Sequence, residues 1–161
     1  MIPSSSQETP LTPYAQKLST ALLEHEYQQF CGIEIMTQQP GFCKTRMTVT
    51  EHIDNLSQTL HGGVIYSMMD VTSMLATIAT LDDGEYAITN NFSSNIMSAT
   101  QRGETVEFEA EISRNGRNLL FSQCYAYKLT KSGKRTLIAS AQLSKFKRRQ
   151  ELNTTQKVTL Q

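Results

Sequence analysis

The residues best placed to do chemistry are His61, Gly62 and Gly63, followed by Asp70. Two adjacent glycines let a backbone come close to a ligand. The first amide groups of a helix have no partner within it, and the helix dipole makes that end positive, so these amides could hold an oxyanion. A carboxylate in an apolar segment is costly unless it is paired, hydrogen-bonded or used. This short stretch therefore offers an oxyanion-binding turn and a carboxylate that is expected to be buried.

The segment that carries these residues, 59–80, is predicted to be one long helix after the glycines. Apolar side chains fall on almost every side of it, which is typical of a buried helix rather than a surface helix. Those side chains are Val64, Ile65, Met68, Met69, Val71, Met74, Leu75, Ile78 and Ala79. Asp70 is the single charge in this helix, and the rest of the chain is expected to pack around it.

The same segment resembles the signature of hotdog-fold thioesterases. Asn55 precedes Leu60-His61-Gly62-Gly63, and Asp70 follows nine positions after the histidine. The similarity is to the branch that contains the phenylacetate-pathway acyl-CoA thioesterases, and it covers roughly residues 30–147. The His-Gly-Gly motif alone is weak, but together with the asparagine, the acid and the long strands that follow it is strong. The family often has glycine three residues before the histidine, where this chain has Gln58.

The resemblance implies hydrolysis of an acyl-CoA thioester and gives each motif residue a role. The N–H group of Gly62 would polarise the thioester carbonyl. Asp70 would act as general base on water, or would attack directly and form an anhydride. Asn55 would hold the water or the substrate carbonyl, and His61 would brace the turn by hydrogen bonding. Thr89 matches a strand hydroxyl of the family that helps to position the nucleophilic water.

The spacing of the motif predicts that two subunits share each site. Gly62 and Asp70 are eight residues apart, which is about 12 Å along a helix axis. A reacting carbonyl must lie about 3 Å from both its oxyanion donor and its attacking group. A second helix running antiparallel could bring the Gly62 amide of one subunit opposite Asp70 of the other. We therefore expect a homodimer with two equivalent sites, and the resemblance adds a tetramer, built as a dimer of dimers.

A wider set of residues is predicted to contact the substrate. Met69 and Met74 could line an acyl pocket, because methionine tolerates irregular shapes, although the methionines of this helix belong mostly to the core. Asn91 and Asn95 are predicted on the same side of their strand as Thr89, and they could contact the substrate or simply pair across strands. Arg117 could meet the CoA phosphates, which need cations, or be an ordinary surface charge. The predicted substrate-binding set is Gly63, Met69, Met74, Asn91, Asn95 and Arg117.

Other groups with possible chemistry are interpreted as structural. His52 and Asp54 lie in a polar segment, 51–58, and are expected on an exposed loop rather than as a catalytic pair. The basic run that begins at Lys145 is interpreted as a solvated chain end. Asp70 itself could be a satisfied structural carboxylate, although the neighbouring glycines favour a catalytic role.

Hydrophobic patterning predicts one domain with polar ends. Residues 1–11 are rich in Ser, Thr, Pro and Gln and are expected to be disordered, residues 12–147 form a single hotdog domain, and residues 148–161 form a polar tail. Thr12-Pro13 predicts a helix start, and an amphipathic surface helix is expected over 14–29. Strands are predicted over 31–36, 42–50, 86–97, 105–114, 117–130 and 136–146, with a hairpin at Asn115-Gly116.

One buried helix followed by hairpin-linked strands gives an α+β layout, with an antiparallel sheet packed on a long helix. The resemblance supplies the name hotdog for this arrangement: a long central helix wrapped by the sheet, with an additional N-terminal helix.

Composition excludes several classes of function. Lys plus Arg equals Asp plus Glu, at 15 each in 161 residues, which argues against nucleic acid as a partner. No apolar run is long enough to predict a membrane span, and the polar N-terminus predicts a cytoplasmic protein rather than a secreted one. The three scattered cysteines are expected to fill the core. Neither a metal nor a cofactor is expected, because the sequence has no CxxC motif and no cluster of His and Cys.

Two other functions remain open at this point. A non-catalytic acyl-CoA-binding protein could keep the same fold, although a binder needs no embedded base such as Asp70. A hydratase or dehydratase of the hotdog type is less favoured, because those enzymes usually pair a catalytic histidine with an acid in another arrangement. The sequence does not determine the acyl group, or whether CoA or acyl carrier protein carries it.

Overall fold

The computed structural model describes residues 10–130 and 132–150. Its elements, in chain order, are α1 (Pro13–Leu23), α2 (Glu26–Cys31), β1 (Glu34–Gln39), β2 (Phe42–Thr48), α3 (Gly62–Ile78), β3 (Glu85–Ile96), β4 (Thr105–Asn115), β5 (Leu119–Leu129) and β6 (Arg135–Arg149).

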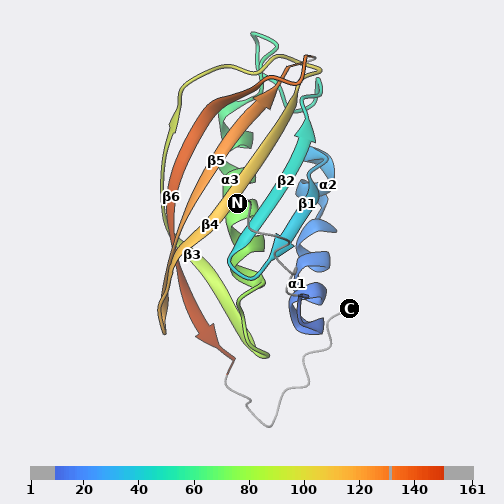
Figure 1. Ribbon diagram of the computed structural model, residues 1–161. Helices are drawn as coiled ribbons and strands as arrows, with labels where there is room; N and C mark the ends of the chain where they lie inside the picture. Colours follow the sequence, from blue (N-terminus) through green and yellow to red (C-terminus); the bar gives the residue numbers. More distant parts are fainter. Residues whose placement is uncertain (1–9, 131, 151–161) are drawn as a thin grey trace, which may run out of the picture.

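The strands form one six-stranded sheet in the order β1-β2-β4-β5-β6-β3, and every neighbouring pair is antiparallel. Figure 1 shows the sheet curving around α3, with α1 and α2 beside β1. The predicted α+β hotdog architecture is therefore confirmed, including the long central helix and the N-terminal helical region. Strand order is a non-local property, and it places β3 beside β6 at one edge of the sheet, far from its neighbours in the sequence.

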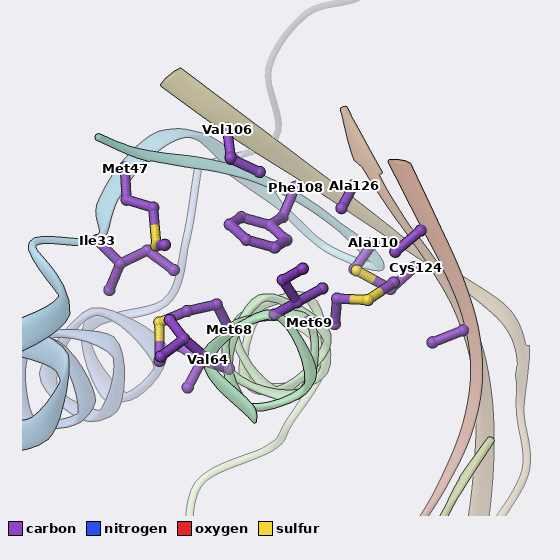
Figure 2. Close-up of a cluster of buried hydrophobic side chains, with 14 of the residues drawn as sticks. Ile33, Met47, Val64, Met68, Met69, Val106, Phe108, Ala110, Cys124 and Ala126 are labelled. Carbon is purple, nitrogen blue, oxygen red and sulfur yellow. The ribbon is translucent and has the colours of Figure 1, made fainter. Parts of the chain in front are cut away.

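Helix α3 is the centre of the hydrophobic core. His61 caps its N-terminus, and its first helical residue is Gly62. Figure 2 shows Phe108 of the sheet lying over α3 and Met69 beside Cys124, and the buried cluster also contains Val64 and Met68 of α3. Burial of this much apolar surface is the main favourable contribution to folding, and it fixes which side of α3 remains outside the core.

The N-terminal region contains two helices, so the prediction of one helix over 14–29 is wrong. The predicted start is confirmed, since Thr12 Oγ1 accepts a hydrogen bond from the Ala15 N–H (3.1 Å). The chain leaves α1 after Leu23 and starts α2 from an extended His25. This break allows both Ala15 and Cys31 to be buried, in two separate clusters of the core. Cys31 therefore ends a helix and does not start a strand.

Strand β3 contains a register shift between Thr89 and Asn91, which the sequence pattern did not reveal. Thr89 pairs with Lys145, whereas Asn91 pairs with the next residue along, Ser144. Such a bulge inserts one extra residue and re-aims the side chains beyond it. Thr89 consequently points toward α3, while Asn91 lies on the outer face of the sheet. The expectation that both share one side of the strand is wrong.

Strand β6 is longer than predicted and continues through Arg149. Arg148 and Arg149, the first two residues of the expected polar tail, therefore belong to the sheet. The expected disordered segment over residues 1–11 and the rest of the expected tail lie largely outside the described residues, which begin at 10 and end at 150.

Candidate active site

Helix α3 has one exposed strip on an otherwise buried surface. Gly62, Tyr66 and Asp70 follow one another at intervals of four residues, so they lie along one side of the helix. Tyr66 is 43% exposed, and its ring contacts Phe92 of β3 edge to face (5.9 Å between centroids). The side chain of Asp70 is 39% exposed. The description of Asp70 as a buried carboxylate is therefore corrected: its helix is buried, but its side chain reaches the surface.

Asp70 is held by two groups that come from different strands. Its Oδ1 atom accepts hydrogen bonds from Thr89 Oγ1 on β3 (2.8 Å) and from Lys145 Nζ on β6 (2.7 Å). Lys145 Nζ also donates to Thr89 Oγ1 (2.7 Å), so the three polar groups form a closed ring. Within the described part of the chain, no group donates a hydrogen bond to Asp70 Oδ2. One oxygen of the carboxylate is thus fixed and the other is free.

Lys145 is the functional-site residue that the sequence interpretation missed. Its side chain is 0% exposed, so the view of this residue as part of a solvated end is wrong. Burial lowers the pKa of Lys145 below its usual value, and the neighbouring Asp70 carboxylate partly opposes that shift. A signal was present, because Lys145 alternates in phase with the buried residues Ala141 and Leu143. An inward lysine needs a partner, and Asp70 is the only charge on the helix that faces this strand.

The start of α3 presents a free amide. His61 Nδ1 accepts a hydrogen bond from the Gly63 N–H (2.9 Å), so the predicted bracing contact of His61 is present. The N–H groups of Val64 and Ile65 are bonded to the His61 carbonyl. By contrast, the Gly62 N–H has no acceptor among residues 10–130 and 132–150. It is therefore available to a ligand at the positive end of the helix.

Asn55 lies near this amide, in the loop that leads to α3. Its Oδ1 atom accepts hydrogen bonds from the Ser57 N–H (2.9 Å), the Thr59 N–H (3.2 Å) and the Thr59 hydroxyl (3.1 Å). These bonds fix the loop and leave the Asn55 side-chain NH₂ without an acceptor in the described structure. Asn55 and Gly62 line a hollow of about 370 Å³, together with Thr59, Leu60, Ile65, Ile96, Met97, Ser98 and Ala99.

The predicted catalytic residues thus form two groups at two places along α3. Asn55 and Gly62 lie at the hollow at the N-terminus of the helix, while Thr89 binds Asp70 two turns further along. Asp70 does not line the hollow. One copy of the chain contains both an oxyanion donor and a carboxylate, but it does not bring them together.

Comparison with known proteins points to the same family that the sequence motif resembles. The family model described as the thioesterase superfamily matches residues 57–134, which include the His-Gly-Gly turn, Asp70 and Thr89. A protein from Deinococcus radiodurans whose esterase activity is inferred is 32% identical over 108 residues, which are 67% of this chain and 66% of that protein. Human acyl-coenzyme A thioesterase 13 is 28% identical over 90 residues, or 56% of this chain and 64% of the human protein.

Solved structures share the fold over most of the chain. A thioesterase family protein from Silicibacter pomeroyi aligns with a TM-score of 0.78 and 23% identity, covering 85% of this chain and 99% of that one. The Escherichia coli PaaI protein, from the phenylacetic acid degradation operon, aligns with a TM-score of 0.73 and 21% identity, covering 88% and 97%. A Streptococcus pneumoniae thioesterase protein crystallised with coenzyme A aligns with a TM-score of 0.70 and 19% identity, covering 84% and 98%.

This chain has the hotdog fold, and its residues 57–134 match the thioesterase superfamily. The aligned segment spans about two thirds of the Deinococcus and human relatives. The matched residues include the His-Gly-Gly turn and Asp70, which carry part of the resemblance noted from the sequence.

The structure places several of the predicted substrate-binding residues away from Asp70. Met69 is fully buried in the core, and Met74 packs against the cluster that contains Ala15, so neither lines the hollow. Asn91 and Asn95 lie on the outer face of the sheet, opposite the face that contacts α3, because of the bulge in β3. These four residues are not retained in the site proposed below.

The remaining two predicted substrate contacts, Gly63 and Arg117, lie closer to the residues of the candidate site. Gly63 is exposed beside Gly62, and its N–H is engaged by His61. Arg117 is exposed in the turn between β4 and β5. This turn lies close to Lys145, because Leu120 at the start of β5 pairs with Lys145. Arg117 therefore stays a candidate for the CoA phosphates.

The loop residues that could suggest other chemistry have structural partners. The ring of His52 lies beside that of Phe30 (6.1 Å between centroids), and Asp54 Oδ2 accepts hydrogen bonds from Arg102 at 2.7 Å. His52 and Asp54 therefore do not form a catalytic pair. In the described structure, no group of three or more His, Cys, Asp and Glu side chains could hold a metal ion, and no helix is long and apolar enough to cross a membrane.

Proposed function

We propose that this protein hydrolyses acyl-CoA thioesters with small or medium acyl groups or aryl groups, at a site shared by two subunits. Its family and its acyl-coenzyme A thioesterase relative support thioester hydrolysis. A structural neighbour crystallised with coenzyme A supports CoA as the carrier. The three free cysteines fit a reducing compartment such as the cytoplasm.

The observation that carries the proposal is the state of the Asp70 carboxylate. Oδ1 is fixed by Thr89 and Lys145, Oδ2 has no partner in the described structure, and the side chain that carries both is 39% exposed. A carboxylate held in this way is suited to accept a proton from water. A purely structural carboxylate gains nothing from leaving one oxygen unpaired at a surface.

The proposed reaction uses the free amide of Gly62 for the charge that develops on the substrate. Its N–H would donate to the thioester carbonyl oxygen, which becomes negative as the attacking oxygen binds the carbonyl carbon. Asp70 Oδ2 would take the proton of the attacking water, the C–S bond would break, and the CoA thiolate would leave and be protonated. The NH₂ group of Asn55 is placed to donate to the carbonyl or to hold the water. Direct attack by Asp70 would give an anhydride that water then opens.

A second subunit is needed to complete this site. The rise from Gly62 to Asp70 is about 12 Å, and these residues lie at different places on the surface of one chain. Strand β3 forms an edge of the sheet with 12 residues and has no further partner strand in the described structure. A long open edge is a template for pairing, and exposed Ile88 and Ile96 lie along it. We therefore propose a homodimer in which α3 of each subunit supplies Asp70 to the Gly62 amide of the other, with a tetramer as a further level of assembly.

The activity can be tested with a panel of acyl-CoA and aryl-CoA thioesters at fixed pH, in which a thiol reagent measures released CoA. The wild-type protein should release CoA from at least one member. Asp70→Asn should lower kcat by about 100-fold or more, because it removes the general base. Asparagine keeps an acceptor for Thr89 and Lys145 but not the negative charge, so circular dichroism should verify that the variant is folded. No release of CoA from any thioester would refute the proposal.

The shared site can be tested by mixing subunits. Gly62→Pro removes the amide hydrogen, and proline is favoured at the first helical position, where Gly62 lies. The preceding His61 already has the extended backbone (φ −63°, ψ 131°) that proline requires. Gly62→Ala is the matched control, because it adds a similar Cβ beside Ile96 but keeps the N–H.

Gly62→Pro should lower kcat by about 100- to 1,000-fold, in contrast to Gly62→Ala. Randomly mixed dimers of Gly62→Pro and Asp70→Asn subunits should regain roughly one quarter of wild-type activity, because half of the dimers contain one intact site. If each parent is inactive and the verified mixed dimers are too, the sharing of sites is wrong.

One observation favours a second candidate, a non-catalytic acyl-CoA-binding protein. The Lys145–Asp70 ion pair satisfies the charge of the carboxylate, as a structural pair would. A binder of this kind would take up acyl-CoA in calorimetry and release no CoA, and Asp70→Asn would leave its affinity unchanged. The free Oδ2 atom makes the enzyme the better-supported candidate.

A further inference from the structure

Lys145 is a buried positive charge that the proposed reaction does not by itself require. It is the only lysine or arginine in the described residues whose side chain is fully closed to solvent. Removing an ammonium group from water is costly even when an anion lies beside it. A lysine in this position therefore calls for an explanation beyond the packing of β6.

The contacts of Lys145 control the direction of every hydrogen bond around Asp70 Oδ1. A lysine ammonium has only donors, so at Thr89 Oγ1 it must be the donor. The single hydroxyl hydrogen of Thr89 is then left to point at Asp70, where Oγ1 lies 2.8 Å from Oδ1. Lys145 thus donates to Asp70 directly and also orients the second donor.

We propose that Lys145 is the positioning residue of the site, which holds Asp70 by Oδ1 and keeps Oδ2 turned toward the exposed strip of α3. This inference rests on the proposed thioester hydrolysis, because Oδ2 is the atom that would receive the proton of water. Charge-assisted hydrogen bonds are shorter and stronger than neutral ones. Two of them meeting from β3 and β6 hold the carboxylate more firmly than the threonine alone.

Lys145 does not itself touch the substrate. Its side chain has no surface for a ligand to reach, and its ammonium group is engaged by Asp70 and Thr89. It therefore acts through Asp70, and its removal should affect the chemical step rather than substrate binding.

The surroundings of Lys145 also predict a pH dependence. Asp70 of α3 and Cys124 of β5 are the titratable groups that act on it, and Thr89 is its neighbour on β3. Burial raises the pKa of the Cys124 thiol strongly, so this neighbour stays neutral. Burial lowers the pKa of Lys145, so Lys145 loses its proton at a lower pH than surface lysines. As the pH rises through that value, the hold on Asp70 is lost and kcat should fall.

The test compares wild-type protein with Lys145→Met, Asp70→Asn and the double variant in steady-state acyl-CoA hydrolysis. Methionine is an unbranched side chain, one atom shorter than lysine and without its charge. Lys145→Met should lower kcat by about 10- to 100-fold, the effect of a misplaced reacting group, while KM should stay within about twofold. In the Asp70→Asn background the same change should have no further effect. The alkaline fall in kcat should be absent from Lys145→Met.

Several outcomes would overturn the inference and leave the proposed function intact. These are wild-type kcat in Lys145→Met, an effect confined to KM, or an additive effect in the double variant. If Lys145→Met fails to fold, Lys145→Gln, which keeps a donor but no charge, replaces it with the same criteria. If wild-type protein releases no CoA, the proposed function has failed, and the role of Lys145 fails with it.

Discussion

The Nζ atom of Lys145 lies 2.7 Å from Oδ1 of Asp70, and the two partners differ sharply in exposure. The lysine is closed to solvent, whereas 39% of the aspartate side chain is exposed. Loss of Lys145 therefore leaves a carboxylate that water can reach, whereas loss of Asp70 leaves an ammonium group that water cannot reach. The two losses should differ in their effect on the free energy of unfolding.

Lys145→Met should change the free energy of unfolding by no more than about 1 kcal/mol, because the remaining Asp70 carboxylate can be hydrated. Asp70→Ala should cost about 3 kcal/mol or more, because it leaves a buried ammonium group uncompensated. Urea unfolding of both variants at neutral pH provides the comparison. Equal losses in the two variants would mean that the asymmetry of burial does not control the stability of the pair.

Thr89→Val should impair activity with a limited effect on stability. The change removes the hydroxyl that donates to Asp70 and accepts from Lys145, at a cost of about 1–2 kcal/mol in unfolding free energy. We expect kcat to fall by about 10-fold, as the carboxylate loses one of its two donors. Thr89→Ser is the control, because it keeps the hydroxyl and should stay close to wild type. Full activity of Thr89→Val would show that the hydroxyl has no role.

Gln58→Gly should stabilise the protein. Gln58 has a positive φ of 58°, a conformation that costs a side-chain-bearing residue about 1–2 kcal/mol. Its backbone is fixed there, because its N–H donates to the Asn55 carbonyl and its carbonyl accepts from the Arg102 N–H. Glycine removes that cost but is more flexible when unfolded, so the net gain should be about 0.5 kcal/mol in thermal or urea unfolding. Gln58→Ala, which keeps Cβ, should show no gain.

Alkaline pH should destabilise the fold through its buried thiols. Burial raises the pKa of Cys43 to about 12, whereas an unfolded cysteine titrates near about 8.5. Between these values the unfolded state releases the proton and the folded state keeps it, so the stability present below about pH 8.5 is lost as the pH rises. Each such thiol contributes about 1.4 kcal/mol per pH unit.

The measurement is urea unfolding at pH 7.5, 9 and 10 with a reductant present. Cys43→Ala should show a shallower decline with pH than wild type, whatever its stability at pH 7.5. Lys145 acts in the opposite direction, because its lowered pKa favours the folded state as the pH rises, and it is common to both proteins. Parallel pH profiles would contradict the assignment to Cys43.

Several features that depend only on neighbouring residues could be predicted from the sequence. The apolar faces of α3, the capping of α1 by Thr12 and the strands β2 and β4 depend on local patterns, and each is confirmed. The break between α1 and α2 was missed because it satisfies the burial of Cys31, a contact with distant segments.

The candidate site also contains residues that could be predicted from local sequence and residues that could not. His61, Gly62 and Asp70 lie on one continuous helix, so their spacing alone defined a candidate oxyanion donor and a candidate base. Asn91 and Asn95 were assigned to the wrong face, because a single bulge in β3 reverses the side-chain direction, and alternation in the sequence does not reveal a bulge.

The sequence by itself determined the central helix, the strands around it and the acid that the helix carries. Only the tertiary structure decided that Lys145 lies under that acid, since it lies 75 residues away along the chain. The physical reason is the order of the sheet, in which β6 lies between β5 and β3. This order brings Thr89 and Lys145 into register beside α3, and pairing between distant strands depends on the whole core rather than on any local pattern.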